Sequence, residues 1–310
     1  MDAIAGLLDG PRARDAFLML SSMDPPWSLR IQDEAPLTVL AIVRGEAWAI
    51  PDGGEEVPLQ QGDVVVFRGP DPYTVADHPE TPPQAVIHPG QRCTTVDGVE
   101  LAEQWNRGVR TWGNTPYGAT AMLTGTYQMQ GEVSRRLLRA LPSLLVLHDD
   151  EWDCPVVPLL AEEVVRDEPG QEAVLDRLLD LLLIAVLRAW FARPDARAPD
   201  WYRAYSDPVV GHALRLLHHN PAHRWTVAGL AREVGVSRAA LARRFHDLVG
   251  EPPMTFLTGW RIALAADLLR EPGATISSVA HQVGYSSPFA LSTAFKRIRG
   301  VSPQQHRAAA

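Results

Sequence analysis

Two stretches of the chain decide its fold: LAREVGVSRAALARRF at residues 230–245 and VAHQVGYSSPFALSTAFKR at residues 279–297. Both carry apolar residues, an alanine, a glycine and a phenylalanine in the same order, and the second has one extra residue after its glycine. A Gly-x-x-Pro sequence follows each stretch, starting at Gly250 and at Gly300. Self-similarity at a fixed spacing is typical of a repeated supersecondary unit, so we expect two copies of one motif.

The residue types within each copy predict a helix-turn-helix. Gly235 and Gly284 stand where the turn needs the left-handed backbone conformation, which costs little only for glycine. Ala231 and Ala280 stand where the two helices of a copy would cross, and a small side chain there lets the backbones approach. Residues that can cap short helices precede the apolar segments, at Thr226, Ser237, Thr275, Ser287 and Ser302.

In each copy the apolar positions would bury one face of the second helix and leave the other face free to contact DNA. On that face we expect Ser237, Arg238, Ala239, Ala242 and Arg243 in the first copy, and Ser287, Pro288, Phe289, Thr293 and Lys296 in the second. Arginine suits phosphate oxygens or the paired acceptors of guanine, whereas apolar side chains and threonine favour contacts with the thymine methyl group. The first copy is therefore predicted to have the stronger base preference.

The charge of the chain is divided unevenly. All 310 residues together carry a formal net charge of −8. Residues 207–310 contain twelve Lys and Arg against six Asp and Glu, a net of +6, so the remaining residues carry −14. The basic C-terminal part alone is able to hold a polyanion such as DNA.

These features resemble the DNA-binding domain of AraC-type transcription regulators. The likeness covers residues 207–310 and includes the ending FKRIRGVSPQQHR, where His306 replaces an aromatic residue that is usual in the family. The stretch FLTGWRIALAADLLR at residues 256–270 resembles the long helix that connects the family's two motifs. The resemblance implies an all-α domain that binds a double-stranded DNA operator, with RNA polymerase as a further partner if the regulator is an activator.

A linker is expected over residues 193–206, where Pro194 and Pro199 interrupt the chain. Upstream of it, short β-branched runs alternate with turn signals between residues 37 and 87, and helices are expected over residues 131–147 and 172–191. The stretches GDVVVF (62–67), LTGTYQM (123–129) and LLRALPSLLVL (137–147) resemble the cupin-type sensor domain of one AraC-type subgroup. The expected fold class is α+β with two domains: a cupin-like sensor and dimerisation domain at residues 1–192, a β barrel with flanking helices, and the helical domain at residues 207–310.

The helix expected over residues 172–191 is apolar on most of its circumference. Leu175, Leu178 and Leu182 form one stripe, and Leu179 and Leu183 lie on another. A helix with so wide an apolar surface needs a partner on more than one side. It is either buried under the β domain or forms the interface of a homodimer.

An enzymatic cupin would need a His-x-His pair with a third histidine and a carboxylate around a metal. Residues 45–50 offer Glu46 and Trp48 instead, and His78 and His88 lie ten residues apart. We therefore expect no metal, no cofactor and no catalytic activity. Two alternatives stay open: a cupin-type metal enzyme, and a DNA-binding protein whose barrel only dimerises.

The signal that the N-terminal domain would sense is not specified by the sequence. Trp48, Phe67, Tyr73 and Tyr127 are candidates to line a barrel interior that holds a small-molecule effector, although such residues also serve as plain core.

Cys93 and Cys154 are the candidates for a redox signal. Cys93 follows Arg92, whose guanidinium would favour the reactive thiolate. Two cysteines far apart in sequence fit a reducing compartment, and the acidic N-terminal stretch does not resemble a secretory signal. The most apolar run, residues 173–191, contains four charged residues, so we expect a cytoplasmic protein without a membrane span.

Overall fold

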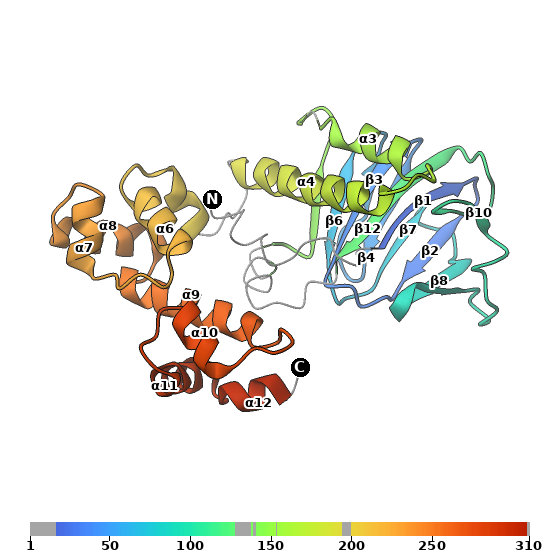
Figure 1. Cartoon of the computed structure of the whole chain (residues 1–310). Coiled ribbons are helices and arrows are strands. Elements are labelled where there is room, and N and C mark those ends of the chain that lie inside the picture. The colour runs from blue at the N-terminus through green and yellow to red at the C-terminus, as the bar shows by residue number, and fades with distance from the viewer. Residues whose placement is uncertain (1–16, 128–137, 139–140, 153, 194–199, 309–310) are drawn as a thin grey trace. The chain divides into compact units, whose positions relative to one another are not determined.

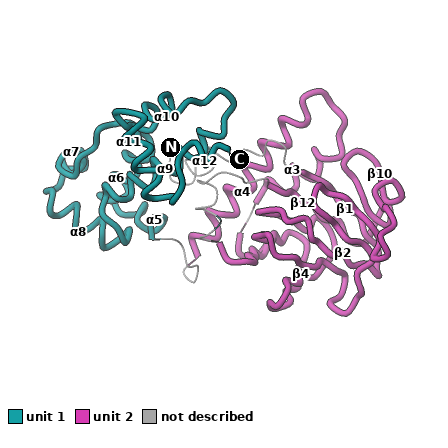
Figure 2. Tube along the Cα trace, turned by 90° about the horizontal axis from the view of Figure 1, so that it is seen from below, with its two compact units in different colours: residues 1–10, 130–140, 197–310 teal, residues 11–129, 141–196 magenta. Residues whose placement is uncertain are grey.

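The computed structural model describes residues 17–127, 138, 141–152, 154–193 and 200–308, which form two compact units (Figure 2). The described residues of the N-terminal unit contain the β-strands and two α-helices. The C-terminal unit contains the helices from Asp200 onward.

The first sheet of the N-terminal unit is built around long antiparallel strands. In spatial order its described strands are β10 (Asn106–Gly108), β11 (Thr111–Trp112), β1 (Phe17–Met23), β12 (Thr120–Tyr127), β3 (Leu37–Arg44), β6 (Val64–Arg68) and β13 (Leu144–Leu147). Strands β1 and β11 form its parallel pair. Valine, leucine and isoleucine dominate the central strands, because branched side chains pack well on a pleated surface.

Strand β13 differs from the sequence prediction. Residues 144–147 were expected to end a helix, but they pair antiparallel with β6, Leu144 opposite Phe67 and Leu147 opposite Val64. The helix prediction is wrong at these residues, because four consecutive apolar residues carry no periodicity that separates a buried strand from a helix. The earlier part of the same prediction, at residues 131–137 and 139–140, lies outside the described residues.

The second sheet faces the first across an apolar core. In spatial order its described strands are β5 (Val57–Leu59), β4 (Ala47–Pro51), β7 (Tyr73–Ala76), β2 (Ser28–Ile31), β8 (Ala85–His88) and β9 (Arg92–Thr94). The core includes Ile31 and Tyr73 from this sheet, and Leu40, Phe67 and Met122 from the first. In the described residues no strand pairs across the two sheets, so the predicted barrel takes the form of two open, facing sheets.

Helices α3 (Val156–Glu163) and α4 (Gln171–Ala192) pack on the first sheet, on the side away from the second (Figure 1). A Cβ at Gly125 of β12 would lie 2.6 Å from Leu179 Cδ1, so α4 packs closely on this strand. The Tyr127 hydroxyl donates a hydrogen bond to the Leu179 carbonyl oxygen at 2.7 Å. Met122 lies an odd number of residues from both Gly125 and Tyr127, so its side chain is on the opposite face of β12 and points into the core between the sheets. The helix predicted over residues 172–191 is thus confirmed, and β12 separates it from that core.

The C-terminal unit is all-helical in its described residues. Its helices are α5 (Asp200–Arg203), α6 (Val210–His219), α7 (Val227–Glu233), α8 (Arg238–Val249), α9 (Pro253–Leu268), α10 (Ile276–Gln282), α11 (Pro288–Arg299) and α12 (Pro303–Ala308). Helix α5 lies within the expected linker, yet Trp201 and Ala204 are buried in the core of this unit. The fold therefore begins before residue 207. No helix among the described residues is both long and apolar enough to cross a membrane.

Helix α9 is the predicted connector, and it divides the C-terminal unit into two halves. Phe256, Leu257 and Trp260 of its first part lie in one core with α6, α7 and α8. Ile262 and Ala265 of its second part lie in another core with α10 and α11. Each copy of the sequence repeat therefore has its own apolar core, and one helix contributes to both.

Candidate nucleic-acid interface and effector cavity

The two predicted helix-turn-helix motifs are present, α7 with α8 and α10 with α11 (Figure 1). Gly235 and Gly284 occupy their turns with φ of 75° and 83°, the left-handed region that favours glycine. The hydroxyls of Ser237 and Ser287 accept hydrogen bonds from the backbone N–H three residues on, both at 3.2 Å. These two predicted contact residues therefore also cap the second helices, α8 and α11.

One face of α8 is free of packing contacts with its own core. Leu241 and Phe245 are fully buried on the inner face. The predicted contact residues lie away from them, with Arg238, Ala239 and Arg243 exposed and Ala242 half-buried. The structure therefore brings the predicted residues of the first copy together on one accessible helix face.

Two adjacent arginines of α8 have different roles. Arg244 donates from Nε and Nη2 to Asp207 Oδ2, at 2.9 and 2.6 Å. Asp207 also accepts from the backbone N–H of Val209 and of Val210. Burial acts in the opposite direction, but the Val210 N–H and the Arg244 guanidinium together hold the pKa of Asp207 below its ordinary value. Arg243 is exposed and forms no ion pair within the described chain, which leaves it available to a phosphate or a base edge.

The equivalent face of α11 is less polar. Pro288 is its first helical residue, and Phe289 next to it is 81% exposed. Thr293 and Lys296 are exposed on the following turns. The other described aromatic side chains of this unit pack in or against its apolar cores, whereas that of Phe289 is accessible to a partner.

Each copy has one further candidate contact residue, at a position that the repeat relates to a predicted one in the other copy. Beyond the turn the copies are related by an offset of fifty residues, since α8 begins at Arg238 and α11 at Pro288. Lys296 therefore corresponds to His246, which is exposed, and Ala242 corresponds to the half-buried Ser292. Applying the fifty-residue offset to every predicted contact residue of the two helices would have identified His246 and Ser292 from the sequence.

Arg261 of α9 connects the two halves of the C-terminal unit. Its Nε donates to the Pro221 carbonyl oxygen at 2.6 Å, and its Nη2 donates to that of His223 at 2.8 Å. The guanidinium carbon lies 5.8 Å from the ring centroid of Tyr285, next to the turn of the second motif. A Cβ at Gly284 would lie 2.7 Å from the Ala222 Cα, so the same loop contacts that turn directly. These contacts fix the second motif against the first.

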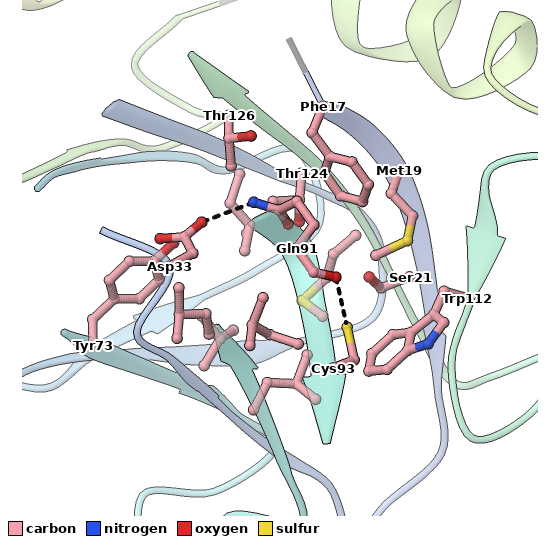
Figure 3. Close-up of a pocket in the computed structure, with 16 residues that line it drawn as sticks. Phe17, Met19, Ser21, Asp33, Tyr73, Gln91, Cys93, Trp112, Thr124 and Thr126 are labelled. Carbon is pink, nitrogen blue, oxygen red and sulfur yellow. Dashed lines mark hydrogen bonds between the residues drawn. The ribbon is translucent and has the colours of Figure 1, made fainter. Parts of the chain in front are cut away.

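In the N-terminal unit, a cavity of about 40 Å³ lies between the two sheets (Figure 3). Of the four aromatic effector candidates, Tyr73 lines it. Phe67 stacks on Tyr73 with ring centroids 3.6 Å apart, and Trp48 is half-buried with its ring 6.5 Å from that of His78. Tyr127 points to α4, because residues an odd number apart on a strand face opposite sides.

The two cysteines are not joined in a disulfide. Cys93 lines the cavity, and burial together with the nearby Glu100 raises the pKa of its thiol to about 11. Arg92 pairs with Glu100 at 2.6 Å instead of activating the thiol. Cys154 is half-buried just before α3. At neutral pH Cys93 is thus a protonated, buried thiol, which weighs against a redox role that depends on thiolate.

The N-terminal histidines have ordinary hydrogen-bond partners. His88 Nε2 lies 3.0 Å from Thr94 Oγ1, and His78 Nδ1 accepts from the backbone N–H of Glu80 at 3.2 Å. Across the residues that the structure describes, no three His, Cys, Asp or Glu side chains are grouped so that they could hold a metal ion.

Comparison with known proteins decides the family. Residues 2–192 match the family model described as "Cupin", and residues 230–309 match "Helix-turn-helix domain". A "Putative AraC-like transcription regulator" of Streptomyces lividans is 32% identical over 286 residues, which cover 91% of this chain and 90% of that protein. The chain belongs to the AraC-like family of transcription regulators.

Two further relatives extend over most of the chain. A "Putative AraC-like transcription regulator" of Streptomyces antibioticus is 32% identical over 292 residues, 91% of this chain and 90% of its own. The "HTH-type transcriptional regulator AlkR" of Acinetobacter baylyi is 27% identical over 318 residues, 99% of each chain. This AraC-like protein is therefore a DNA-binding transcription regulator with a cupin domain, and not an enzyme.

Proposed function

We propose that this AraC-like regulator reads its operator with α8 and α11 together, and that its N-terminal unit responds to a small-molecule effector. The observation that carries the first part is the pair of accessible helix faces. One has Arg238 and Arg243 and the other has Phe289 and Thr293, and both follow a glycine turn and a serine cap. An arginine pair suits guanine or phosphate, and an apolar face suits thymine methyl groups.

Recognition helices that enter successive major grooves lie about one helical turn, roughly 34 Å, apart on DNA. One chain would then cover an asymmetric site longer than one turn. Footprinting of the full chain on sequences selected from a randomised pool tests this. Two protected segments are expected on one face of the duplex, and a single protected groove segment would contradict the use of both helices. RNA polymerase is a further partner if the regulator activates transcription.

We also propose a homodimer through α4. Val174, Leu178, Leu181 and Ala185 follow one another at alternating spacings of four and three residues, which is the spacing of a coiled-coil seam. Val174 is 45% and Leu181 is 48% exposed, while Leu178 and Ala185 are half-buried, so the described part of the protomer leaves this stripe only partly covered. Leu182, part of the stripe expected from the sequence, is 2% exposed and belongs to that core instead.

The dimer is tested by Leu181→Glu with Ala173→Glu as the control, since Ala173 is exposed on the same helix but lies off the stripe. Sedimentation of the full chain should show a halved mass for Leu181→Glu and an unchanged mass for Ala173→Glu. Equal masses for the wild type and a folded Leu181→Glu variant would place any interface elsewhere.

A further inference from the structure

The cavity between the two sheets is mostly apolar. Its apolar wall consists largely of aliphatic side chains from both sheets: Leu29, Ile31, Leu40, Val75, Ile87 and Met122. Buried water occurs where polar groups can hold it, whereas apolar cavities stay dry and accept apolar molecules. The wall therefore favours a hydrocarbon body over a hydrated one.

Polar groups are present in the lining as well. Asp33 accepts at Oδ2 from the Gln91 amide at 3.1 Å and at Oδ1 from the Ala35 backbone N–H at 3.1 Å (Figure 3). An ionised carboxylate has about four acceptor positions, so this group retains capacity for another donor. Thr126, 2% exposed, has a hydroxyl with no hydrogen-bond partner in the described chain. Buried polar groups are almost always paired in native proteins, so this hydroxyl is available to pair with a molecule bound in the cavity.

The charge of the lining selects among polar heads. Among the described residues that line the cavity, Asp33 is the one carboxylate. Burial raises the pKa of Tyr73 and of Cys93, so both are uncharged at neutral pH. A carboxylate or phosphate in the cavity would be repelled by Asp33 without a compensating cation in the lining. A head that donates a hydrogen bond, in contrast, would be attracted to Asp33.

We propose that this cavity binds a small, mostly apolar molecule with a single hydrogen-bond-donating head, a hydroxyl or a protonated amine, with the head at Asp33 and Thr126. The proposal rests on the effector role given above to the N-terminal unit. The size of the cavity limits the body: about 40 Å³ corresponds to roughly three water molecules. A longer chain requires the half-buried side chains of Phe17, Met19 and Gln91 to move, and methionine adapts its shape readily.

The experiment compares probes of one length and different heads. Ethylamine, ethanol and acetate are titrated into the full chain, and binding is followed by saturation-transfer NMR and by the shift of lining methyl signals such as those of Met122. We expect the amine and the alcohol to bind and to shift these signals, and acetate to bind at least tenfold more weakly. Equal or stronger binding of acetate, or no binding of any probe, overturns the proposal.

Two variants locate the head. Thr126→Val removes the hydroxyl at nearly constant volume and should weaken the alcohol and the amine several-fold without impairing folding, since the hydroxyl has no partner to lose. Asp33→Asn should weaken the amine more than the alcohol. Thr111→Val on β11, outside the cavity lining, is the matched control and should leave all affinities unchanged. Wild-type affinity in both cavity variants would refute the placement.

DNA affinity is measured separately, with and without the bound probe. Probe binding that leaves DNA affinity and dimer mass unchanged would contradict the effector role while the cavity assignment stands. Loss of probe binding in the cavity variants, with DNA affinity retained, would support the cavity independently of how the operator is read.

Discussion

The two helix-turn-helix copies share their turn glycines, caps and buried phenylalanines, yet they differ in what surrounds these residues. The turn at Gly235 is open, with nothing within 4 Å of an added Cβ, whereas the turn at Gly284 is pressed against Ala222. Arg244 of the first copy is paired with Asp207, and its counterpart Ala294 is buried. One repeated motif is therefore fixed by different parts of the chain in its two copies and presents a different chemistry on each outer face.

The largest difference should appear when the two turn glycines are replaced. Either alanine would hold an unfavourable left-handed backbone, which costs roughly 1–2 kcal/mol. At Gly284 the added Cβ also overlaps the Ala222 backbone at 2.7 Å, so Gly284→Ala should lower the free energy of unfolding about twice as much as Gly235→Ala. Hydrogen exchange of the full chain should show lost protection in α10 and α11 for Gly284→Ala. Equal losses in the two variants would contradict the difference between the turns.

The next effect concerns the reading faces. Arg243→Ala should weaken operator binding by about 1–3 kcal/mol and relax preference at one base pair if the arginine contacts guanine, whereas loss of a phosphate contact would weaken all sequences alike. Thr293→Ala should have a smaller effect at different base pairs. Sequencing of the DNA bound from a randomised library checks both, with Arg215→Ala on α6 as the charge control. Changes at the same base pairs in both variants would mean that the helices do not read successive segments.

Loss of the contacts that hold the two copies together should reduce DNA affinity more than it reduces the stability of the fold. Arg261→Met keeps the aliphatic stem but removes the bonds to the Pro221 and His223 carbonyl oxygens. A hydrogen bond to a charged group contributes about 1.5 kcal/mol or more. Because the Arg261 side chain is half-buried, we expect the binding free energy for a two-segment DNA site to fall by about this lower figure. Binding to a duplex with one segment should change little. A uniform loss on both duplexes would show that Arg261 does not fix the spacing.

The smallest effect is a pH dependence confined to the first copy. The pKa of Asp207 is lowered in the folded protein, so its contribution to stability is complete above the ordinary carboxyl pKa of about 3.9 and is lost as the pH falls through the folded value. Asp207→Ala should cost about 1 kcal/mol at pH 7, the usual loss when a side chain that accepts backbone N–H bonds at a helix start is removed, and less near pH 3. Hydrogen exchange in α6 and α8 between pH 3 and 7 measures it. A stability difference between the wild type and Asp207→Ala that stays constant from pH 3 to pH 7 would contradict the role given to this carboxylate.

The sequence predicted best where a residue acts on its immediate neighbours. Thr226, Ser237, Thr275 and Ser287 cap the helices that they were expected to cap, because capping joins residues only three positions apart. The strand at residues 144–147 was missed because its partner β6 lies far away in the chain. Tyr127 was grouped with the wrong face since the start of its strand could not be fixed by pattern alone. Of the four aromatic effector candidates, only Tyr73 lines the cavity, because facing sheets bring distant residues together in ways that a local pattern does not predict.

Strand β12 has a consequence for how events at the two faces of the N-terminal unit influence each other. Thr124 and Thr126 line the cavity, while Gly125 and Tyr127 between and beside them hold α4. One strand therefore belongs to both sites. If a bound molecule favours one position of this strand, and that position favours self-association through α4, thermodynamic reciprocity requires association to tighten ligand binding by the same factor. Ligand affinity would then rise with protein concentration, so the abundance of the regulator would itself set its sensitivity.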